Sequence, residues 1–286
     1  MAGLADLLPA VATRLADAGI PTPTVDAELL IGHVLGLSRG EVQARAIVGL
    51  EVEPSDVAAI DALVARRSER EPLQHITGRA WFRSIELEVG PGVFVPRPET
   101  EQVTQFAIDA LRAVPGASPI AVDLGTGSGA IAFSLATEVQ NARVWAVEVS
   151  PDAYPWTVRN RERTGATNAT VILGDLVDAL HELDGTVDVV ASNPPYIPRD
   201  AVPRDPEVRL HDPELALYGG EDGLDVVRQV STTALRLLHP GGVLVLEHGE
   251  LQGPDIAALL RADGWVAVAT HKDLLGRDRA TTALKH

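Results

Sequence analysis

The sequence contains no cysteine, only two lysines and no long apolar run. Without cysteine the chain has no disulfides, cysteine-bound zinc, iron–sulfur clusters or thiol catalysis, and it suits a reducing compartment. The first residues lack a basic stretch followed by an apolar core, and nowhere do about 18 apolar residues run together. The histidines include no His-x-His or His-x-x-x-His pair. We therefore expect a cytoplasmic protein with no membrane partner and no metal site.

Acidic residues outnumber basic ones, 40 to 24, which gives a formal net charge of −16. The summed field should repel phosphate backbones over most of the surface, so direct binding of nucleic acid is disfavoured. The first 80 residues follow the same balance, with seven arginines and eleven acids. That charge suits a domain that recognises protein better than one that recognises nucleic acid.

Length and composition indicate a folded chain of two domains. The 286 residues exceed a typical domain of roughly 150 residues, and an apolar share of 45% with 22% charged residues excludes a disordered or collagen-like polypeptide. Helical spacing dominates residues 1–75, where apolar residues from Leu4 to Leu15 recur at three- and four-residue intervals before Gly19. Capping residues predict three more helices, and these residues are Thr24, Ser38 with Glu41 as a capping box, and Ser55.

Strand-like alternation replaces the helical spacing over residues 76–98. It runs through Ile85, Leu87 and Val89, and a Gly-Pro-Gly turn then leads into a short apolar run from Val93 to Val95. This pattern predicts a β-hairpin that links the two domains. From residue 99 to 286 apolar runs alternate with helical stretches, which is typical of an α/β fold with a mostly parallel sheet covered on both faces. The predicted strands are Ile120–Leu124, Val144–Val149, Thr170–Leu173, Val187–Ser192, Val243–Glu247 and Trp265–Thr270.

A glycine-rich turn follows the first of these strands. It reads Gly125-Thr126-Gly127-Ser128-Gly129, and a helix begins near Ala130. Small residues let the backbone approach a ligand closely, and Glu148 stands near the spacing of about 20 residues expected for an acid that binds ribose hydroxyls. The third glycine comes one position earlier than in the dinucleotide fingerprint, which favours a nucleoside ligand without phosphates. The alternative is a tight turn with no ligand.

Asp175 follows the third predicted strand of this region. At the carboxyl edge of the sheet its carboxylate could accept a hydrogen bond from an adenine amino group. The alternative is an aspartate that only stabilises its own turn.

The tetrapeptide Asn193-Pro194-Pro195-Tyr196 follows the strand Val187–Ser192. The side-chain oxygen of Asn193 and the carbonyl of Pro194 can accept both hydrogens of a planar –NH₂ group, because the fixed proline φ angles hold these acceptors still. Tyr196 can stack on a flat substrate. Such a clamp aims the remaining lobe of a weakly nucleophilic nitrogen at an electrophile. The alternative is a proline-rich turn with Tyr196 as a lid over the core.

Together these features resemble the seven-stranded, Rossmann-like class I of S-adenosylmethionine-dependent methyltransferases, and within it the family of release-factor glutamine methyltransferases. The resemblance covers almost the whole chain. The segments that carry it are Arg66–Arg67, Glu71–Gly78, Phe94–Glu101, Asp123–Gly129, Ser192–Tyr196, Tyr218–Asp225 and Glu247–Gly249.

The resemblance implies three parts of the chain: a helical substrate-recognition domain over 1–75, a β-hairpin linker over 76–98 and a methyltransferase domain over 99–286. The implied reaction moves a methyl group from S-adenosylmethionine, which leaves as S-adenosylhomocysteine, to the side-chain amide nitrogen of a glutamine. That glutamine belongs to the Gly-Gly-Gln motif of class I peptide chain release factors, the implied partners. The enzyme is expected to act as a monomer.

Site residues are carried over by position. The implied cofactor-binding residues are Gly125, Thr126, Gly127, Ser128, Gly129, Glu148, Asp175, Leu176 and Asn193. The implied catalytic residues are Asn193, Pro194 and Tyr196, and the implied substrate-binding residues are Asn193, Pro194, Pro195, Tyr196 and Arg97. Leu176 departs from relatives that carry an aromatic residue there. Arg97 and Glu99 either line the mouth of the site or form a structural ion pair, and Glu247 with His248 either lies near the site or is structural.

Two other functions fit part of the sequence. Methylation of an exocyclic amino group of adenine or guanine is the nearer one, because the same clamp can hold a flipped base; the acidic balance argues against it. A binding protein that keeps the fold without the reaction is the other, because a fold alone does not establish activity.

Overall fold

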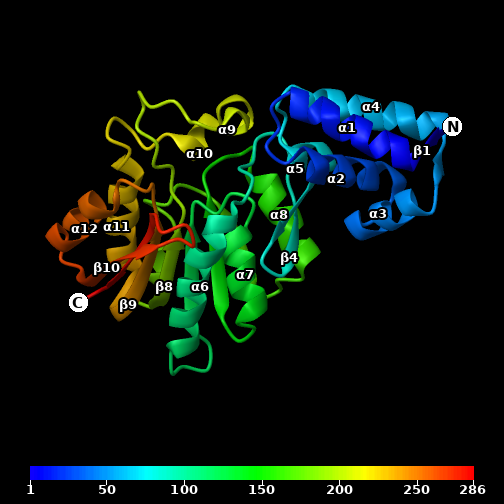
Figure 1. Cartoon of the computed structure of the whole chain (residues 1–286). Coiled ribbons are helices and arrows are strands. Elements are labelled where there is room, and N and C mark those ends of the chain that lie inside the picture. Colours follow the sequence, from blue (N-terminus) through cyan, green and yellow to red (C-terminus); the bar gives the residue numbers. More distant parts are fainter. The chain divides into compact units, whose positions relative to one another are not determined.

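The computed structural model describes residues 1–286, which divide into two compact units. One unit combines residues 1–78 with 204–211, and the other combines residues 79–203 with 212–286. Figure 1 shows the elements of both units in sequence colours. None of the helices combines the length and the apolar character that a membrane-spanning segment requires.

The first unit is a helical bundle around one apolar core. Leu4, Leu15, Leu30 and Ile60 are completely buried in it. Two-residue strands, β1 (Ala2–Gly3) and β2 (Glu51–Val52), pair antiparallel beside the bundle. The helices are α1 (Leu4–Asp17), α2 (Pro23–Leu35), α3 (Arg39–Ile47), α4 (Pro54–Ser68), α5 (Leu73–Thr77) and α9 (Pro206–His211).

Helix starts in this unit test the predicted caps. The capping box of Ser38 and Glu41 is confirmed, since each side chain bonds the backbone of the other. The predicted caps at Thr24 and Ser55 are wrong by two residues, because the N-cap residues are Thr22 and Glu53, and α2 begins at Pro23 and α4 at Pro54. Proline fixes φ near the helical value and has no N–H to leave unpaired, so it is well suited to the first helical position.

Helix α9 joins this unit through a buried ion network. Arg67 donates to Asp26 at 2.7 Å and to Glu207 at 2.8 Å, and Arg70 donates to the second oxygen of Glu207 at 2.6 Å. Arg67 and Asp26 are 6% and 4% exposed. Burial alone would raise the pKa of Glu207, but hydrogen bonding with Asp205, Arg67 and Arg70 lowers it to about 2.

The second unit opens with an antiparallel hairpin, β3 (Arg79–Phe82) and β4 (Ile85–Glu88). Its turn is at Arg83 and Ser84, so the predicted hairpin around Gly90-Pro91-Gly92 is wrong, and residues 93–95 form no strand. Asn160 holds β4 in place: its side chain accepts from the amide of Glu88 and donates to the carbonyls of Glu88 and Ser128. The hairpin and the glycine-rich turn therefore share one anchor.

A seven-stranded sheet forms the centre of this unit, in the order β10-β11-β9-β8-β5-β6-β7. All neighbours are parallel except at β11, which is antiparallel to β9 and to β10. The predicted mostly parallel α/β sheet is confirmed, but β11 was missed. The strands are β5 (Ile120–Leu124), β6 (Arg143–Glu148), β7 (Ala169–Leu173), β8 (Val187–Ser192), β9 (Leu238–Glu247), β10 (Val266–Lys272) and β11 (Asp278–Leu284).

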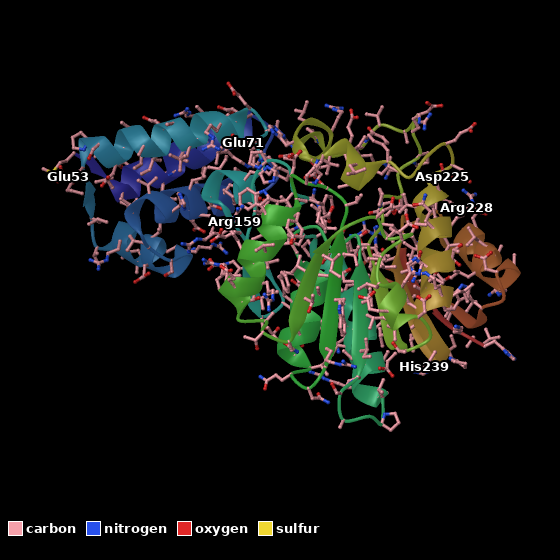
Figure 2. The ribbon with its side chains drawn as sticks, turned by 180° about the vertical axis from the view of Figure 1, so that it is seen from behind. Glu53, Glu71, Arg159, Asp225, Arg228 and His239 are labelled. Atoms are coloured by element: carbon pink, nitrogen blue, oxygen red, sulfur yellow. The ribbon has the colours of Figure 1, made fainter.

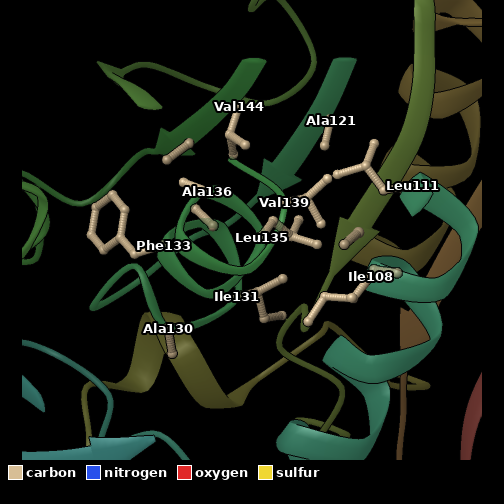
Figure 3. Close-up of a cluster of buried hydrophobic side chains, with 14 of the residues drawn as sticks. Ile108, Leu111, Ala121, Ala130, Ile131, Phe133, Leu135, Ala136, Val139 and Val144 are labelled. Carbon is tan, nitrogen blue, oxygen red and sulfur yellow. The ribbon is translucent and has the colours of Figure 1, made fainter. Parts of the chain in front are cut away.

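Helices cover both faces of the sheet, because successive strand residues point to opposite sides. Ala121 packs in one buried cluster with α6 and α7, and Val122 packs in the other with α11 and α12. Figure 3 shows the first cluster, in which Ile108 and Leu111 of α6 face Leu135 of α7 and Val139, the residue after that helix. The remaining helices are α6 (Pro98–Ala113), α7 (Ala130–Glu138), α8 (Tyr154–Thr164), the 3-10 turn η1 (His181–Leu183), α10 (Glu214–Leu217), α11 (Asp225–Leu237) and α12 (Gly253–Ala262).

Candidate active site

The predicted site residues lie at the carboxyl edge of the sheet. β5 leads into Gly125, β6 ends at Glu148, β8 leads into Asn193 and β9 ends at Glu247. The chain continues from β5 to β6 on one side, whereas β8 pairs with β5 on the other, so the strand order reverses at β5. Open α/β sheets bind ligands in the crevice outside such a reversal.

The three glycines of the turn have different roles. Gly125, Gly127 and Gly129 all have positive φ, +74°, +57° and +86°, which favours glycine. A Cβ atom at Gly125 or Gly127 would meet nothing within 4 Å, whereas one at Gly129 would lie 2.0 Å from the ring of Phe133. The first two glycines therefore leave open space for a ligand, and the third allows close helix packing.

Asp123 stabilises this turn through hydrogen bonds, a role that the sequence did not predict. One carboxylate oxygen accepts from the hydroxyl of Thr126 at 2.6 Å and from the amide of Ala132 at 3.1 Å. Burial raises the pKa of Asp123 to about 7, although both hydrogen bonds oppose that shift. The other oxygen, Oδ1, is buried and has no partner. The signal in the sequence was an acid within the apolar strand β5.

Glu148 joins the same turn to the loop that follows β6, with one oxygen bonded to each. Its Oε2 accepts from the amide of Gly127 at 2.7 Å, and its Oε1 accepts from the amide of Ser150 at 2.8 Å. Burial raises the pKa of Glu148 above its ordinary value, and these amides counteract the rise. An ionised carboxylate offers about four lone-pair sites, so two remain for hydroxyl groups of a ligand.

Asp175 and Leu176 follow β7 at the same edge. The carboxylate of Asp175 accepts from the amide of Val177 at 3.0 Å, as in an aspartate turn, and its side chain is exposed. Leu176 is half-buried against the core cluster of α11 and α12. The turn accounts for one oxygen of Asp175 and leaves the other available.

The Asn193–Tyr196 segment is fixed from both ends. Upstream, the hydroxyl of Ser192 donates to the carbonyl of Leu124 at 2.7 Å. Downstream, the amide of Ile197 donates to the carbonyl of Leu217 at 2.8 Å. A Cβ atom on Gly219 would lie 2.5 Å from the carbonyl oxygen of Pro195, so only glycine fits there.

The loop that supplies Gly219 is tied to helix α11. Arg228 donates to Asp222 at 3.1 Å and to Asp225 at 3.0 Å, and Figure 2 labels the last pair, Arg228 and Asp225. The hydrogen bonds from Arg228 and from the backbone amide of Leu224 lower the pKa of Asp222 to about 2. The loop that contains Gly219 is therefore held in place where it meets the Asn193–Tyr196 segment.

Arg97 forms an ion pair. Its guanidinium donates to Asp212 at 2.6 Å and lies 4.9 Å from the ring centroid of Phe94. Its positive charge also lowers the pKa of Tyr196 and of Glu247, so it acts close to the clamp. The two interpretations from the sequence, an ion pair and the mouth of the site, are compatible. Glu99 adds negative charge beside the same two groups.

Glu247 and His248 are buried at the end of β9, 1% and 0% exposed. Burial raises the pKa of Glu247 to about 7, and its Oε2 has no hydrogen-bond partner. The ring of His248 lies 3.0 Å from the hydroxyl of Thr281 and 2.9 Å from the carbonyl of Gly249. Burial also raises the pKa of Tyr196 to about 12, and the charge of Glu247 adds to that rise.

Known protein families match both parts of the chain. The family described as "PrmC N-terminal domain" matches residues 6–78, and the family described as "Methyltransferase domain" matches residues 119–274. Among solved structures, a 16S rRNA N2 G1207 methyltransferase from T. thermophilus, in complex with AdoMet and guanosine, superposes with a TM-score of 0.53. It is 24% identical and covers 73% of this chain and 50% of that one, so the likeness concerns the fold.

Curated relatives match over nearly the full length. A release factor glutamine methyltransferase from Streptomyces coelicolor is 52% identical, over 95% of this chain and 94% of its own length. A protein of the same name from Bifidobacterium longum is 45% identical, over 96% and 97%. A 4-amino-L-phenylalanine/4-methylamino-L-phenylalanine methyltransferase from Streptomyces pristinaespiralis is 42% identical, over 91% and 88%.

Proposed function

Because the chain belongs to the family of release factor glutamine methyltransferases, we propose that it methylates the side-chain amide nitrogen of a glutamine in a peptide chain release factor. The methyl donor is S-adenosylmethionine, and the acceptor is the glutamine of the Gly-Gly-Gln motif. The observation that carries the proposal is that the glycine-rich turn follows β5, where the strand order reverses, and that the Asn193–Tyr196 clamp follows the adjacent strand β8.

The cofactor side of the site suits a nucleoside. Gly125 and Gly127 leave open space above the turn. Glu148 retains two lone-pair sites for the ribose hydroxyls, and its bonds to Gly127 and Ser150 fix the direction of the carboxylate. Asp175 and Leu176 are proposed to flank the adenine. When bound, S-adenosylmethionine supplies an electrophilic methyl group attached to a sulfonium.

The acceptor side must increase the reactivity of an amide nitrogen, whose lone pair is conjugated with its carbonyl. In the proposed mechanism, the side-chain oxygen of Asn193 and the carbonyl of Pro194 each accept one N–H of the glutamine amide. This directs the remaining lobe of the nitrogen at the methyl group and stabilises the positive charge that would develop as the N–C bond forms and the sulfonium–methyl bond breaks. One N–H proton of the amide would then be lost to water. Tyr196 packs against the planar amide, and Arg97 with Glu99 lies at the mouth.

The test is mass spectrometry of a purified class I release factor after incubation with this protein and S-adenosylmethionine. A gain of one methyl group on the glutamine of Gly-Gly-Gln is the expected result. RNA, DNA and 4-amino-L-phenylalanine are offered in parallel reactions. Transfer to one of these acceptors with an unmodified release factor would keep the chemistry and change the substrate. No transfer, together with no binding of S-adenosylmethionine in calorimetry, would leave a protein without the reaction.

A further inference from the structure

The two prolines leave the clamp with few groups that can hold it in place. Pro194 and Pro195 have no N–H, so the backbone from Asn193 to Tyr196 has only its carbonyls and its two end amides for hydrogen bonding. In the proposed reaction the carbonyl of Pro194 is reserved for the substrate. The carbonyl of Tyr196 is the first group after the prolines that a protein side chain holds.

That side chain belongs to Gln252, which precedes helix α12. Its Nε2 donates to the carbonyl of Tyr196 at 2.9 Å, and its Oε1 accepts from the amide of Gly249 at 3.0 Å. Both ends of the amide are therefore used, which fixes its orientation. Gln252 bridges the loop after β9 to the clamp after β8.

Two glycines beside this bridge, Gly223 and Gly249, have no room for a side chain larger than hydrogen. A Cβ atom on Gly223 would lie 2.4 Å from the carbonyl oxygen of Tyr196 and 3.0 Å from Nε2 of Gln252. A Cβ atom on Gly249 would lie 2.9 Å from Oε1 of Gln252. Glycines at both positions thus let the amide reach its partners, so the bridge is enclosed by the backbone around it.

We propose that Gln252 is a positioning residue of the methyl transfer. Four backbone torsions separate the carbonyl of Pro194 from the carbonyl of Tyr196, and proline fixes one of them. Holding the carbonyl of Tyr196 restricts the other three, so the carbonyl of Pro194 is less free to turn away from the acceptor amide. The hydrogen bonds of the Gln252 side chain go to the backbone of Gly249 and Tyr196, so its proposed action is through the clamp. The inference rests on the proposed function, because it concerns the orientation of the acceptor.

The first test replaces Gln252 by methionine, which has similar volume and makes neither hydrogen bond. Turnover is measured as methyl transfer to the release factor, with calorimetry for S-adenosylmethionine and thermal unfolding for the fold. We expect kcat to fall between about 10-fold and 10²-fold, as for a small misplacement of reacting groups, with cofactor affinity unchanged. Gln229→Met is the matched control, because Gln229 is exposed on helix α11.

The second test uses Gln252→Glu, which keeps the shape and remains informative if the methionine variant does not fold. An ionised carboxylate still accepts from Gly249, but its other oxygen then faces the carbonyl of Tyr196 and repels it. A protonated carboxyl group donates instead and restores the bridge. We therefore expect kcat of this variant, relative to the unmodified chain, to rise as the pH is lowered.

Charged groups of both signs surround position 252. Glu250 and Asp255 flank it in the chain, Glu247 and His248 end β9, and Asp278 of β11 lies near Gly253, whose added Cβ would be 3.1 Å from the Asp278 carboxylate. On the positive side, Arg279 donates to the carbonyl of His248 at 3.2 Å, and the charges of Arg279 and Arg97 act on Tyr196 and Glu247. The carboxylates favour protonation of a glutamate at position 252 and the arginines oppose it, so the test is the direction of the pH dependence and not its midpoint.

Unchanged kcat in Gln252→Met would overturn the inference, and so would an equal loss of cofactor affinity and kcat/KM. A kcat ratio of Gln252→Glu to the unmodified chain that does not vary with pH would also overturn it. Failure of the proposed function has a different signature, because the unmodified chain itself would then leave the release factor unmethylated.

Discussion

Glu148 offers the sharpest quantitative test of the cofactor site through the substitution Glu148→Gln. Its carboxylate already accepts one backbone amide on each oxygen, from Gly127 and Ser150. A glutamine has one oxygen and one –NH₂ group, so in either orientation an N–H group faces an N–H group. The variant therefore loses its bond to the amide of either Gly127 or Ser150. It also loses one charged acceptor for the ribose.

Only the lost ribose acceptor changes Kd directly, because the bond to the backbone amide is broken in the free and the bound protein alike. A hydrogen bond to a charged group contributes about 1.5–3 kcal/mol, which is a factor of about 10 to 10² in Kd. Calorimetric titration with S-adenosylmethionine measures this change. Turnover at saturating cofactor should stay close to that of the unmodified chain, because the acceptor clamp is unaltered.

The same carboxylate predicts a pH dependence. Burial raises the pKa of Glu148, so the ionised form that binds ribose is lost, as the pH falls, at a higher pH than for an ordinary glutamate. Cofactor affinity of the unmodified chain should weaken over that range, and the Glu148→Gln variant should not show this dependence. Asp152→Asn, an exposed acid of the same loop, is the control. An unchanged Kd in Glu148→Gln would refute the reasoning.

Three further substitutions test other parts of the molecule. Asn193→Ala should lower kcat by about 10²-fold or more with cofactor affinity retained, and equal kcat would contradict the clamp. Gly129→Ala should lower the free energy of unfolding by about 3 kcal/mol, because the added methyl group clashes in a buried position. Gly40→Ala, which adds a methyl group in open space, should not destabilise the protein. Denaturant titration measures the free energy of unfolding of both variants. Glu207→Gln should cost about 3–5 kcal/mol because it leaves buried arginines short of a partner, against at most about 1 kcal/mol for Asp61→Asn in an exposed pair. The Glu207 contribution should be lost as the pH falls from 4.5 toward about 2, and a constant difference between variant and unmodified chain over that range would count against it.

Local sequence patterns predicted the helices and strands whose structure depends mainly on neighbouring residues. The strand Ile120–Leu124 is apolar around Asp123 and was predicted with its observed bounds, and the capping box at Ser38 marks a true helix start. β11 was missed because its residues, Asp278–Leu284, are small or polar and show no long apolar run. Only its place between β9 and β10 makes it a strand. The hairpin turn at Arg83 was missed because neither residue of the turn is glycine, asparagine or proline.

The site residues likewise fall into those that local sequence predicted and those that depend on distant segments. Glycine spacing and the Asn-Pro-Pro-Tyr run predict site residues from consecutive positions in the sequence, and the ligand contacts of these residues stay predictions. Gln252 acts on Tyr196 from 56 positions away along the chain, and a glutamine before a helix carries no signal of that role. Asp123 and Glu247 were visible only as acids in apolar runs, and their burial and raised pKa values depend on packing by distant segments.

The helical unit is discontinuous in sequence, and this affects how the protein can be dissected. A fragment that stops at Gly78 contains Asp26, Arg67 and Arg70 but lacks Glu207, the carboxylate that both arginines share. Such a fragment would leave Arg70 without this acceptor and Arg67 with Asp26 alone as its carboxylate partner. A self-sufficient helical module therefore needs residues 204–211 attached to residues 1–78 through an engineered connection, and a simple truncation would underestimate the stability that this module has in the whole chain.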